Sequence, residues 1–515
     1  MKPRSDTAAL LWLGLILSIA LAIAFLLPVT PQDYWWYLRV GRDTLTAGAL
    51  PQIDTLSYTR AGSPVVYFSW GAAVLFWLIY KLGGLSLTVL VRGLLVALAY
   101  SLVWLTARRL GAGRIGAALV LLLAILASSN NWSIRPQLFA YPLFALALYL
   151  LYRWQNGDRK AVWWLPLISL LWVNLHGSFV VLVLLTGAAL VFGRGDKRLL
   201  ALAFGGILLA TLVNPRGFGS WTYVFNSLTV ASSQQFSVEW RPPVNSGWQM
   251  NIFFLWLLAF PLLAVFSPRK LEALEWTWFL GFGVLGLWGE RYVIWFVFIL
   301  TVLTSRMLAD WEKKVLGDPK HGSPALNLTL SLVFILLPLT LLPGVREAWW
   351  PAPRGCCANA PAATENTPVA AAKWLAAHPD LPGPLWSEIG FSSYLEFALP
   401  ERPVWIDTRF EVFPVEQWQQ YKDITNATWE WLILLTGTDA NLLMVSVTEQ
   451  PALLQAMNNQ GLWCEIYRDE VAVIYQRSPG SREVVPVPAR GEVVPVPAYH
   501  PESLTGRGTG HCGGE

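Results

Sequence analysis

Long apolar stretches alternate with short basic connections over the first two thirds of the chain. Because a hydrocarbon core about 30 Å thick needs roughly 20 apolar residues per helix, residues 8–27, which follow Lys2 and Arg4, predict a first membrane span. Further apolar stretches lie at residues 85–107, 115–127, 137–152, 161–173, 177–192, 199–213, 252–266, 273–287, 292–308 and 326–342. The pattern therefore predicts a polytopic α-helical membrane protein of about eleven spans.

The composition supports this class. The chain is 55% hydrophobic and 14% charged and has 29 Trp, whereas soluble domains carry about 25% charged residues. The net charge of +4 comes mostly from Arg and Lys in short loops. It therefore reports topology and gives no reason to expect nucleic acid as a partner.

The basic connections predict which side of the membrane each loop faces. Arg and Lys cluster after residues 107, 152, 192, 266 and 308, and such loops tend to remain in the cytoplasm. This predicts an inner (plasma) membrane protein with a cytoplasmic N-terminus and an extracytoplasmic C-terminal part. Residues 65–80 would break the alternation if they crossed, so we expect a membrane-surface or re-entrant helix there. A twelfth span is the alternative.

The same topology collects the unusual polar residues on the outer side. They fall at the outer ends of spans or in two outer loops, residues 29–84 and 214–250 of a membrane domain that covers residues 1–345. These polar residues include Asp33, Asp54, Arg135, His176, Glu239, Arg241 and Arg291. Because ionisable groups at membrane depth are costly and usually functional, the chemistry is predicted on the extracytoplasmic side.

Asp33 stands directly after the first predicted span, before the aromatic residues 34–37. Such aromatic residues form an interfacial belt in many membrane proteins, which is the structural interpretation of this loop. The functional interpretation is that Asp33 acts as a general base. It would accept a proton from an acceptor hydroxyl or amine while that group attacks an activated sugar.

The order of these features resembles that of integral-membrane glycosyltransferases of the GT-C type. An acidic residue after the first span, a Tyr/Trp-rich helix, a Gly-x-x-Pro turn at residues 48–51 and a second surface helix recur in protein mannosyltransferases and lipid A aminoarabinose transferases. They recur also in uncharacterised bacterial relatives, whose layout is the most similar. The resemblance implies a catalytic base at Asp33, with Asp54 assisting it or binding a cation. It also implies a polyprenyl-phosphate-linked sugar as donor.

The donor phosphate is expected to be bound by arginine, because a guanidinium group matches phosphate geometry. The candidates for binding substrate or phosphate are Arg135, His176, Glu239, Arg241 and Arg291. For the arginines, snorkelling or a salt bridge is the alternative role, and for His176 it is helix packing.

The sequence departs from the family pattern at two points. Phe68-Ser69-Trp70 stands where the relatives tend to begin the surface helix with His-Glu-Trp, and the Asp-x-Asp pair of metal-dependent oligosaccharyltransferases is absent. We therefore expect no required cofactor and assign no metal site. A divalent cation, Mg²⁺ or Mn²⁺, between Asp33, Asp54 and Glu239 is the alternative.

Residues 351–476 have the pattern of an extracytoplasmic α/β domain. A helix is predicted at residues 367–378, strands at 385–389, 404–406 and 442–447, and a hairpin at 462–467 and 471–475. Asp407 and Arg409 follow the second strand. They are candidates to contact the acceptor, although an ion pair that holds the turn is the favoured role.

Two features at the C-terminal end complete the prediction. The Pro- and Gly-rich residues 479–515 repeat Glu-Val-Val-Pro-Val-Pro-Ala and predict a disordered tail. A disulfide from Cys356 or Cys357 to Cys464 is compatible with an oxidising compartment.

These features favour a membrane glycosyltransferase that moves a sugar from a polyprenyl-phosphate donor to an extracytoplasmic glycan, lipid or protein, with inverting attack. Membrane lipid and the lipid-linked donor are the expected partners. A polysaccharide or lipid-linked glycan exporter, a polymerase or ligase, and a non-enzymatic envelope assembly protein are the alternatives.

Overall fold

The computed structural model describes residues 6–316, 322–350, 364, 366–381 and 383–478. Its contacts divide the chain into two compact units. The helical unit comprises Met1–Val29, Val40–Leu50 and Tyr67–Pro351, and the α/β unit comprises Thr30–Arg39, Pro51–Val66 and Ala352–Glu515. The first outer loop is thus divided between the two units, which the sequence pattern did not indicate.

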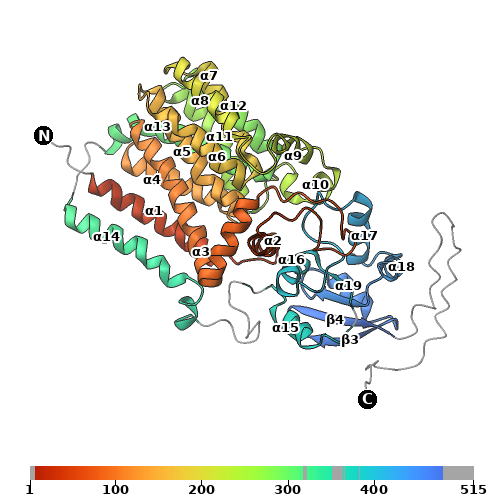
Figure 1. The fold of residues 1–515 in the computed structure, drawn as a ribbon. Coiled ribbons are helices and arrows are strands. Elements are labelled where there is room, and N and C mark those ends of the chain that lie inside the picture. The colour runs from red at the N-terminus through yellow and green to blue at the C-terminus, as the bar shows by residue number, and fades with distance from the viewer. Residues whose placement is uncertain (1–5, 317–321, 351–363, 365, 382, 479–515) are drawn as a thin grey trace. The chain divides into compact units, whose positions relative to one another are not determined.

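Apolar helices make up most of the helical unit, and α1 lies beside α14 and α3 (Figure 1). The α-helices are α1 (Thr7–Leu26), α2 (Tyr34–Ala47, whose first turns belong to the α/β unit), α3 (Trp70–Arg109), α4 (Arg114–Ser128), α5 (Gln137–Gln155), α6 (Leu165–Leu175), α7 (Val180–Phe192), α8 (Lys197–Ala210), α9 (Gly219–Ser227), α10 (Ala231–Phe236), α11 (Gly247–Phe266), α12 (Ala273–Trp288), α13 (Val293–Leu316) and α14 (Pro324–Leu336). The short 3₁₀ helices are η1 (Ser129–Asn131), η2 (Ala161–Trp164), η3 (Gly177–Phe179), η4 (Val238–Trp240), η5 (Glu290–Tyr292), η6 (Leu337–Leu341) and η7 (Arg346–Ala348).

Every apolar stretch predicted from the sequence forms a helix, because a helix satisfies its backbone hydrogen bonds internally, as a lipid environment requires. Within the described residues, 6 helices are long and apolar enough to cross a membrane. They are Thr7–Leu26, Trp70–Arg109, Arg114–Asn131, Gly247–Phe266, Glu290–Val315 and Pro324–Leu341. The count of about eleven spans stays a prediction.

Residues 65–80 contribute the start of α3. The helix begins at Trp70, and the backbone leaves helical geometry at Gly83 and Gly84 before the stretch predicted as the next span. Gly84 has a φ of 59°, a conformation that glycine adopts without steric cost. The segment is thus separated from that stretch by a kink, and its lying at the membrane surface stays a prediction.

The basic connections lie at one end of the helical unit. Arg269, after α11, donates from Nη1 to the carbonyl oxygen of Leu110, after α3, at 3.0 Å. The backbone N–H of Arg194, after α7, donates to Oε1 of Gln155 at the end of α5, at 2.7 Å. The basic connections therefore share one end of the unit, as the charge pattern predicts. That this end faces the cytoplasm stays a prediction.

The α/β unit is built on a mixed four-stranded sheet in the order β1-β2-β4-β3. Its strands are β1 (Leu385–Ser387), β2 (Leu442–Ser446), β3 (Trp463–Arg468) and β4 (Ala472–Arg477), and its helices are α15 (Val369–Ala377), α16 (Ile389–Ala398), α17 (Val415–Thr425), α18 (Trp431–Thr436) and α19 (Pro451–Met457). Strand β1 pairs with β2 in parallel, and β4 pairs with β2 and β3 in antiparallel register. The predicted β3–β4 hairpin is confirmed.

The predicted strand at residues 404–406 is reduced to single bridges. Val404 pairs in parallel with Leu385 of β1 on one side and with Ser57 of the first loop on the other. The first loop thereby extends the edge of the sheet. Cys464 is disulfide-bonded, but Cys356, Cys357 and the tail after residue 478 lie outside the described residues, so the predicted pairing and the predicted tail stay predictions.

Candidate active site

Arg409 joins two carboxylates in the interior of the α/β unit. Its Nε donates to both oxygens of Asp407, at 2.9 and 3.0 Å, and its Nη2 donates to Oδ2 of Asp54 at 3.0 Å. The three side chains are buried, with exposed fractions of 1% for Asp54, 0% for Asp407 and 3% for Arg409. The ion pair predicted between Asp407 and Arg409 is present, and Asp54 of the first loop completes it.

Glu396 on α16 adds a third acidic group to this cluster. It is buried, and no described residue donates a hydrogen bond to either of its carboxyl oxygens. Burial raises the pKa of Glu396 well above its usual range, and the charges of Asp407 and Asp54 raise it further against the opposing effect of Arg409. A protonated Glu396 can donate to Asp407, whereas an ionised one would be left without a donor. We call Asp54, Glu396, Asp407 and Arg409 the buried charge cluster.

Helix α16 also fixes the chain on both sides of Asp33. Ser393 donates from Oγ to the carbonyl oxygen of Gln32 at 2.6 Å, and the ring of Tyr394 meets Trp35 edge-on at 4.8 Å between centroids. Arg39 donates from Nη1 to the carbonyl oxygen of Glu396 at 2.9 Å. Asp33 therefore has a position set by a helix far away in the sequence.

Gly390 allows this close approach. A Cβ at Gly390 would lie 2.4 Å from the carbonyl oxygen of Pro31, a separation that real Cβ atoms do not reach. A side chain at this position would push away the backbone that leads to Asp33.

Asp33 itself is half-buried and lies beside residues 408–411. Trp36, in the first turn of α2, donates from Nε1 to Oγ1 of Thr408 at 3.2 Å. Desolvation raises the pKa of Glu411, and the charges of Asp33 and Asp407 add to this effect, although the Glu411 side chain keeps exposed surface. Asp33 and Glu411 are thus two partly solvent-accessible carboxylates close enough to interact through their charges, next to the buried charge cluster.

A second group of predicted residues gathers in the helical unit around Glu239. Arg135, just before α5, forms an ion pair with Glu239 of η4. The guanidinium of Arg291 in η5 stacks over the ring of Trp240, 4.5 Å from its centroid. Burial acts to raise the pKa of Glu239, but Arg135 and Arg291 outweigh it and lower that pKa. Glu239 is therefore a carboxylate compensated by two arginines.

Arg241 and His176, the other two predicted binding residues, each form a hydrogen bond within their own stretch of chain. The exposed Arg241 donates from Nη2 to the carbonyl oxygen of Gln235 at 2.6 Å. His176, at the end of α6, accepts at Nδ1 from the backbone N–H of Ser178 at 3.1 Å. In the neutral tautomer that this contact requires, Nε2 carries the proton of His176 and is a donor.

The predicted site residues thus form two groups, each inside one unit. The structure brings Asp33, Asp54, Asp407 and Arg409 together in the α/β unit, and Arg135, Glu239 and Arg291 together in the helical unit.

Sequence reasoning missed Glu396, Glu411 and Trp240. The only signal for Glu396 was a single charge within the apolar run of α16, and Glu411 gave none. Trp240 was marked only by its place between the candidates Glu239 and Arg241. Within the ranges that the structure describes, no group of three His, Cys, Asp or Glu side chains is arranged to hold a metal ion.

The apolar helices are those of a multi-pass membrane protein, and the fold is similar to that of two solved enzymes that transfer glycosyl groups. The archaeal oligosaccharyltransferase AglB from Archaeoglobus fulgidus, in complex with an inhibitory peptide and a dolichol-phosphate, matches with a TM-score of 0.54 and 11% identity, over 91% of this chain and 74% of that chain. The arabinofuranosyltransferase AftD from mycobacteria matches with a TM-score of 0.50 and 14% identity, over 90% of this chain and 41% of that chain. No protein-family model matches the sequence, and neither does any curated protein.

Proposed function

We propose that the protein is a glycosyltransferase of the inner membrane that moves a sugar from a polyprenyl-phosphate-linked donor to an extracytoplasmic acceptor. The observation that carries the proposal is the position of Asp33 in this fold, held by α16 beside residues 408–411. Support for the reaction class comes from the two similar structures, both of glycosyl-transferring enzymes, of which AglB holds a dolichol-phosphate.

In the proposed reaction Asp33 is the general base. An acceptor hydroxyl or amine attacks the anomeric carbon of the donor sugar and gives its proton to the Asp33 carboxylate. The bond between the anomeric carbon and the phosphate oxygen breaks, and the polyprenyl phosphate leaves with the electron pair. A single displacement of this kind inverts the configuration at the anomeric carbon.

Arg291 is the residue that we propose to bind the donor phosphate. Arg135 is already ion-paired with Glu239, whereas Arg291 contacts the rings of Trp240 and Tyr292 and has no carboxylate within ion-pair distance among the described residues. Its guanidinium can therefore accept a phosphate without first losing an ion pair. His176 and Arg241 are proposed as supporting contacts.

The buried charge cluster has a positioning role in this proposal. Because Arg409 already satisfies the carboxylates of Asp54 and Asp407, these two groups are poorly suited to take a proton from an acceptor. They instead fix the first loop and residues 404–411, which lie next to Asp33. Their replacement is expected to disturb the base indirectly.

The test is sugar transfer by the purified full-length protein in lipid nanodiscs, supplied with a panel of polyprenyl-phosphate sugars. We expect the wild type to release polyprenyl phosphate and Asp33→Asn to lose at least a hundredfold in kcat, the usual range for a missing general base. Asp43→Asn, on the same helix α2 but paired with Arg42 near the surface, is the matched control and should retain activity.

Arg291 is tested separately in the same assay. Arg291→Gln is expected to weaken the transfer of the lipid-linked sugar, and Arg291→Lys, which keeps the charge, to recover part of it. Equal activity of the wild type and Asp33→Asn would exclude Asp33 as the base. If no donor in the panel is turned over by any folded variant while lipid-linked sugars still bind, the transferase proposal itself fails and export becomes the better hypothesis.

A further inference from the structure

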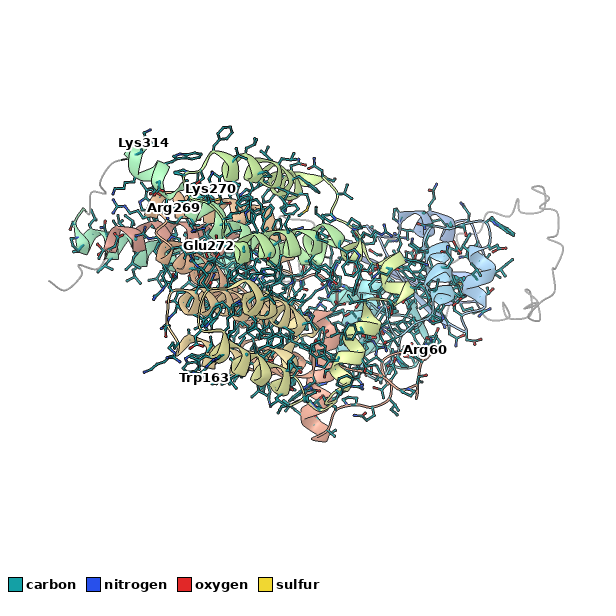
Figure 2. All side chains as sticks on the ribbon, turned by 90° about the horizontal axis from the view of Figure 1, so that it is seen from above. Arg60, Trp163, Arg269, Lys270, Glu272 and Lys314 are labelled. Atoms are coloured by element: carbon teal, nitrogen blue, oxygen red, sulfur yellow. The ribbon has the colours of Figure 1, made fainter. Side chains whose placement is uncertain are left out.

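The basic end of the helical unit contains a cavity of about 770 Å³. Its lining includes four arginines, Arg109, Arg194, Arg269 and Arg306, and two glutamates, Glu272 and Glu275. These side chains come from helices and connections that are far apart in the sequence, with Arg306 in α13 and Glu275 in α12. Figure 2 shows Arg269 and Glu272 together at this end of the helical unit, together with Lys270. We call this space the basic-end cavity.

The two glutamates hold two of the arginines in place. Arg306 donates from Nη1 to Oε2 of Glu275 at 2.5 Å, and Arg194 donates from Nη2 to Oε1 of Glu272 at 2.5 Å. Both carboxylates of the lining are thus already paired. They orient the cationic wall and do not cancel its excess of positive charge.

The other two arginines differ in their partners. Arg269 is paired with Asp310 at 2.8 Å, outside the lining. Arg109 lies beside Tyr149, whose ring centroid is 5.9 Å from its guanidinium carbon and whose hydroxyl is 3.5 Å from its Nη1, and no described carboxylate is within ion-pair distance. Arg109 thus lines the cavity with a positive charge that forms no ion pair with any described carboxylate.

The cavity lies far from the group around Glu239. Helix α5 runs from next to Arg135 at one end to Asn156, a lining residue, just past the other. At 1.5 Å per residue, its 19 residues span about 28 Å. This is close to the roughly 30 Å hydrocarbon thickness of a bilayer. The cavity is therefore distinct from the site proposed for the donor phosphate.

Exposed apolar side chains lie at helix ends close to the cavity. Helix α7 ends just before Arg194, and helix α11 ends just before Arg269. Their last residues are apolar and exposed, with exposed fractions of 61% for Val191 in α7 and of 67% and 71% for Val265 and Phe266 in α11. A ligand with both a phosphate and acyl chains would place its phosphate among the guanidinium groups and its chains along these helix ends.

We infer that the basic-end cavity binds the phosphate group of an anionic phospholipid, with Arg109 as its principal cation. The chemistry that recognises the ligand is guanidinium–phosphate pairing, and a free phosphate in solution would offer the same group. The exposed apolar helix ends favour the lipid as its source. This inference does not depend on glycosyl transfer and stands or fails separately from it.

The test uses the purified full-length chain in detergent. Thermal unfolding is followed during titration with dioctanoyl phosphatidylglycerol, with dioctanoyl phosphatidylcholine and with inorganic phosphate. A ligand that binds only the folded state raises the midpoint of unfolding with concentration. We expect phosphatidylglycerol to raise it and the other two to have little effect at the same concentrations.

Arg109→Gln is the central variant, because it removes a charge without stranding a paired carboxylate. It should weaken the apparent affinity for phosphatidylglycerol by about tenfold or more, the size of one charge-assisted hydrogen bond. Arg109→Lys should recover part of this loss. Lys314→Gln removes a charge at the same end of the unit, outside the lining, and should bind as the wild type does (Figure 2).

Two results would overturn the inference. If inorganic phosphate stabilises the wild type as well as phosphatidylglycerol does, and Arg109→Gln abolishes this, the ligand is a soluble phosphate compound. If Arg109→Gln and Lys314→Gln both bind phosphatidylglycerol like the wild type, the cavity is not the lipid site.

Discussion

Replacing Arg409 by Gln tests the buried charge cluster most directly. The substitution leaves the carboxylates of Asp54 and Asp407, with exposed fractions of 1% and 0%, without their cation. Breaking a buried ion pair from one side costs about 3–5 kcal/mol, because the remaining charge stays buried and uncompensated. Since 1.4 kcal/mol corresponds to a factor of ten, local opening of the α/β unit should become about a hundredfold to several thousandfold more frequent.

Hydrogen exchange of backbone amides measures this opening. The N–H of Leu56 donates to Oδ1 of Asp54 at 2.8 Å, and the N–H of Tyr58 donates to the carbonyl oxygen of Val404 at 3.0 Å. Peptides that cover these residues report whether the first loop remains attached to the sheet edge. We expect their exchange in Arg409→Gln to accelerate by the factor given above, with less change in β3 and β4.

Arg468→Gln is the matched control. Arg468 also pairs with a carboxylate in the α/β unit, that of Glu465, but both side chains are about 40% exposed, and such a pair contributes about 0–1 kcal/mol. Adding Asp407→Asn to Arg409→Gln should recover part of the loss, because one stranded charge is removed. Exchange in Arg409→Gln as slow as in Arg468→Gln would refute the reasoning.

Two further predictions concern α16. Folding raises the pKa of Glu396, so the folded chain holds a proton that the unfolded chain releases. The free energy of unfolding therefore falls as the pH rises above the ordinary glutamate pKa, by up to about 1.4 kcal/mol per pH unit from this group. Glu396→Gln should flatten that slope in thermal unfolding between pH 5 and 8 and raise stability at pH 8; an unchanged slope would show that Glu396 is ionised beside Asp407. Gly390→Ala, whose Cβ would meet the carbonyl of Pro31, should lower kcat by displacing Asp33 while the protein still folds; unchanged kcat would show that the backbone adapts without moving the base.

The membrane part of the fold was largely predictable from sequence, because its signal is local. A run of apolar residues such as 137–152 or 273–287 carries enough information in itself to form a helix in lipid, and α5 and α12 follow these runs closely. The β3–β4 hairpin was predictable for the same reason, since two alternating runs are joined by a short polar turn.

The candidate site was only partly predictable. Asp33 was identified by its place after the first apolar run, and Asp407 and Arg409 by their place after a short apolar segment. Their arrangement depends on contacts over very long separations, such as that of Arg409 with Asp54, 355 residues apart. Such a contact leaves no periodic pattern in the sequence.

The sequence by itself determined the class of the protein, the position of most helices and the gathering of basic residues in alternate connections. Tertiary structure alone decided that the first loop joins the α/β unit, that Glu396 shares a buried environment with Asp407, and that Arg109 lines a cavity with no described carboxylate as its partner. The physical reason is that apolar burial and backbone hydrogen bonding act along the chain, whereas charge pairing depends on which side chains packing brings together.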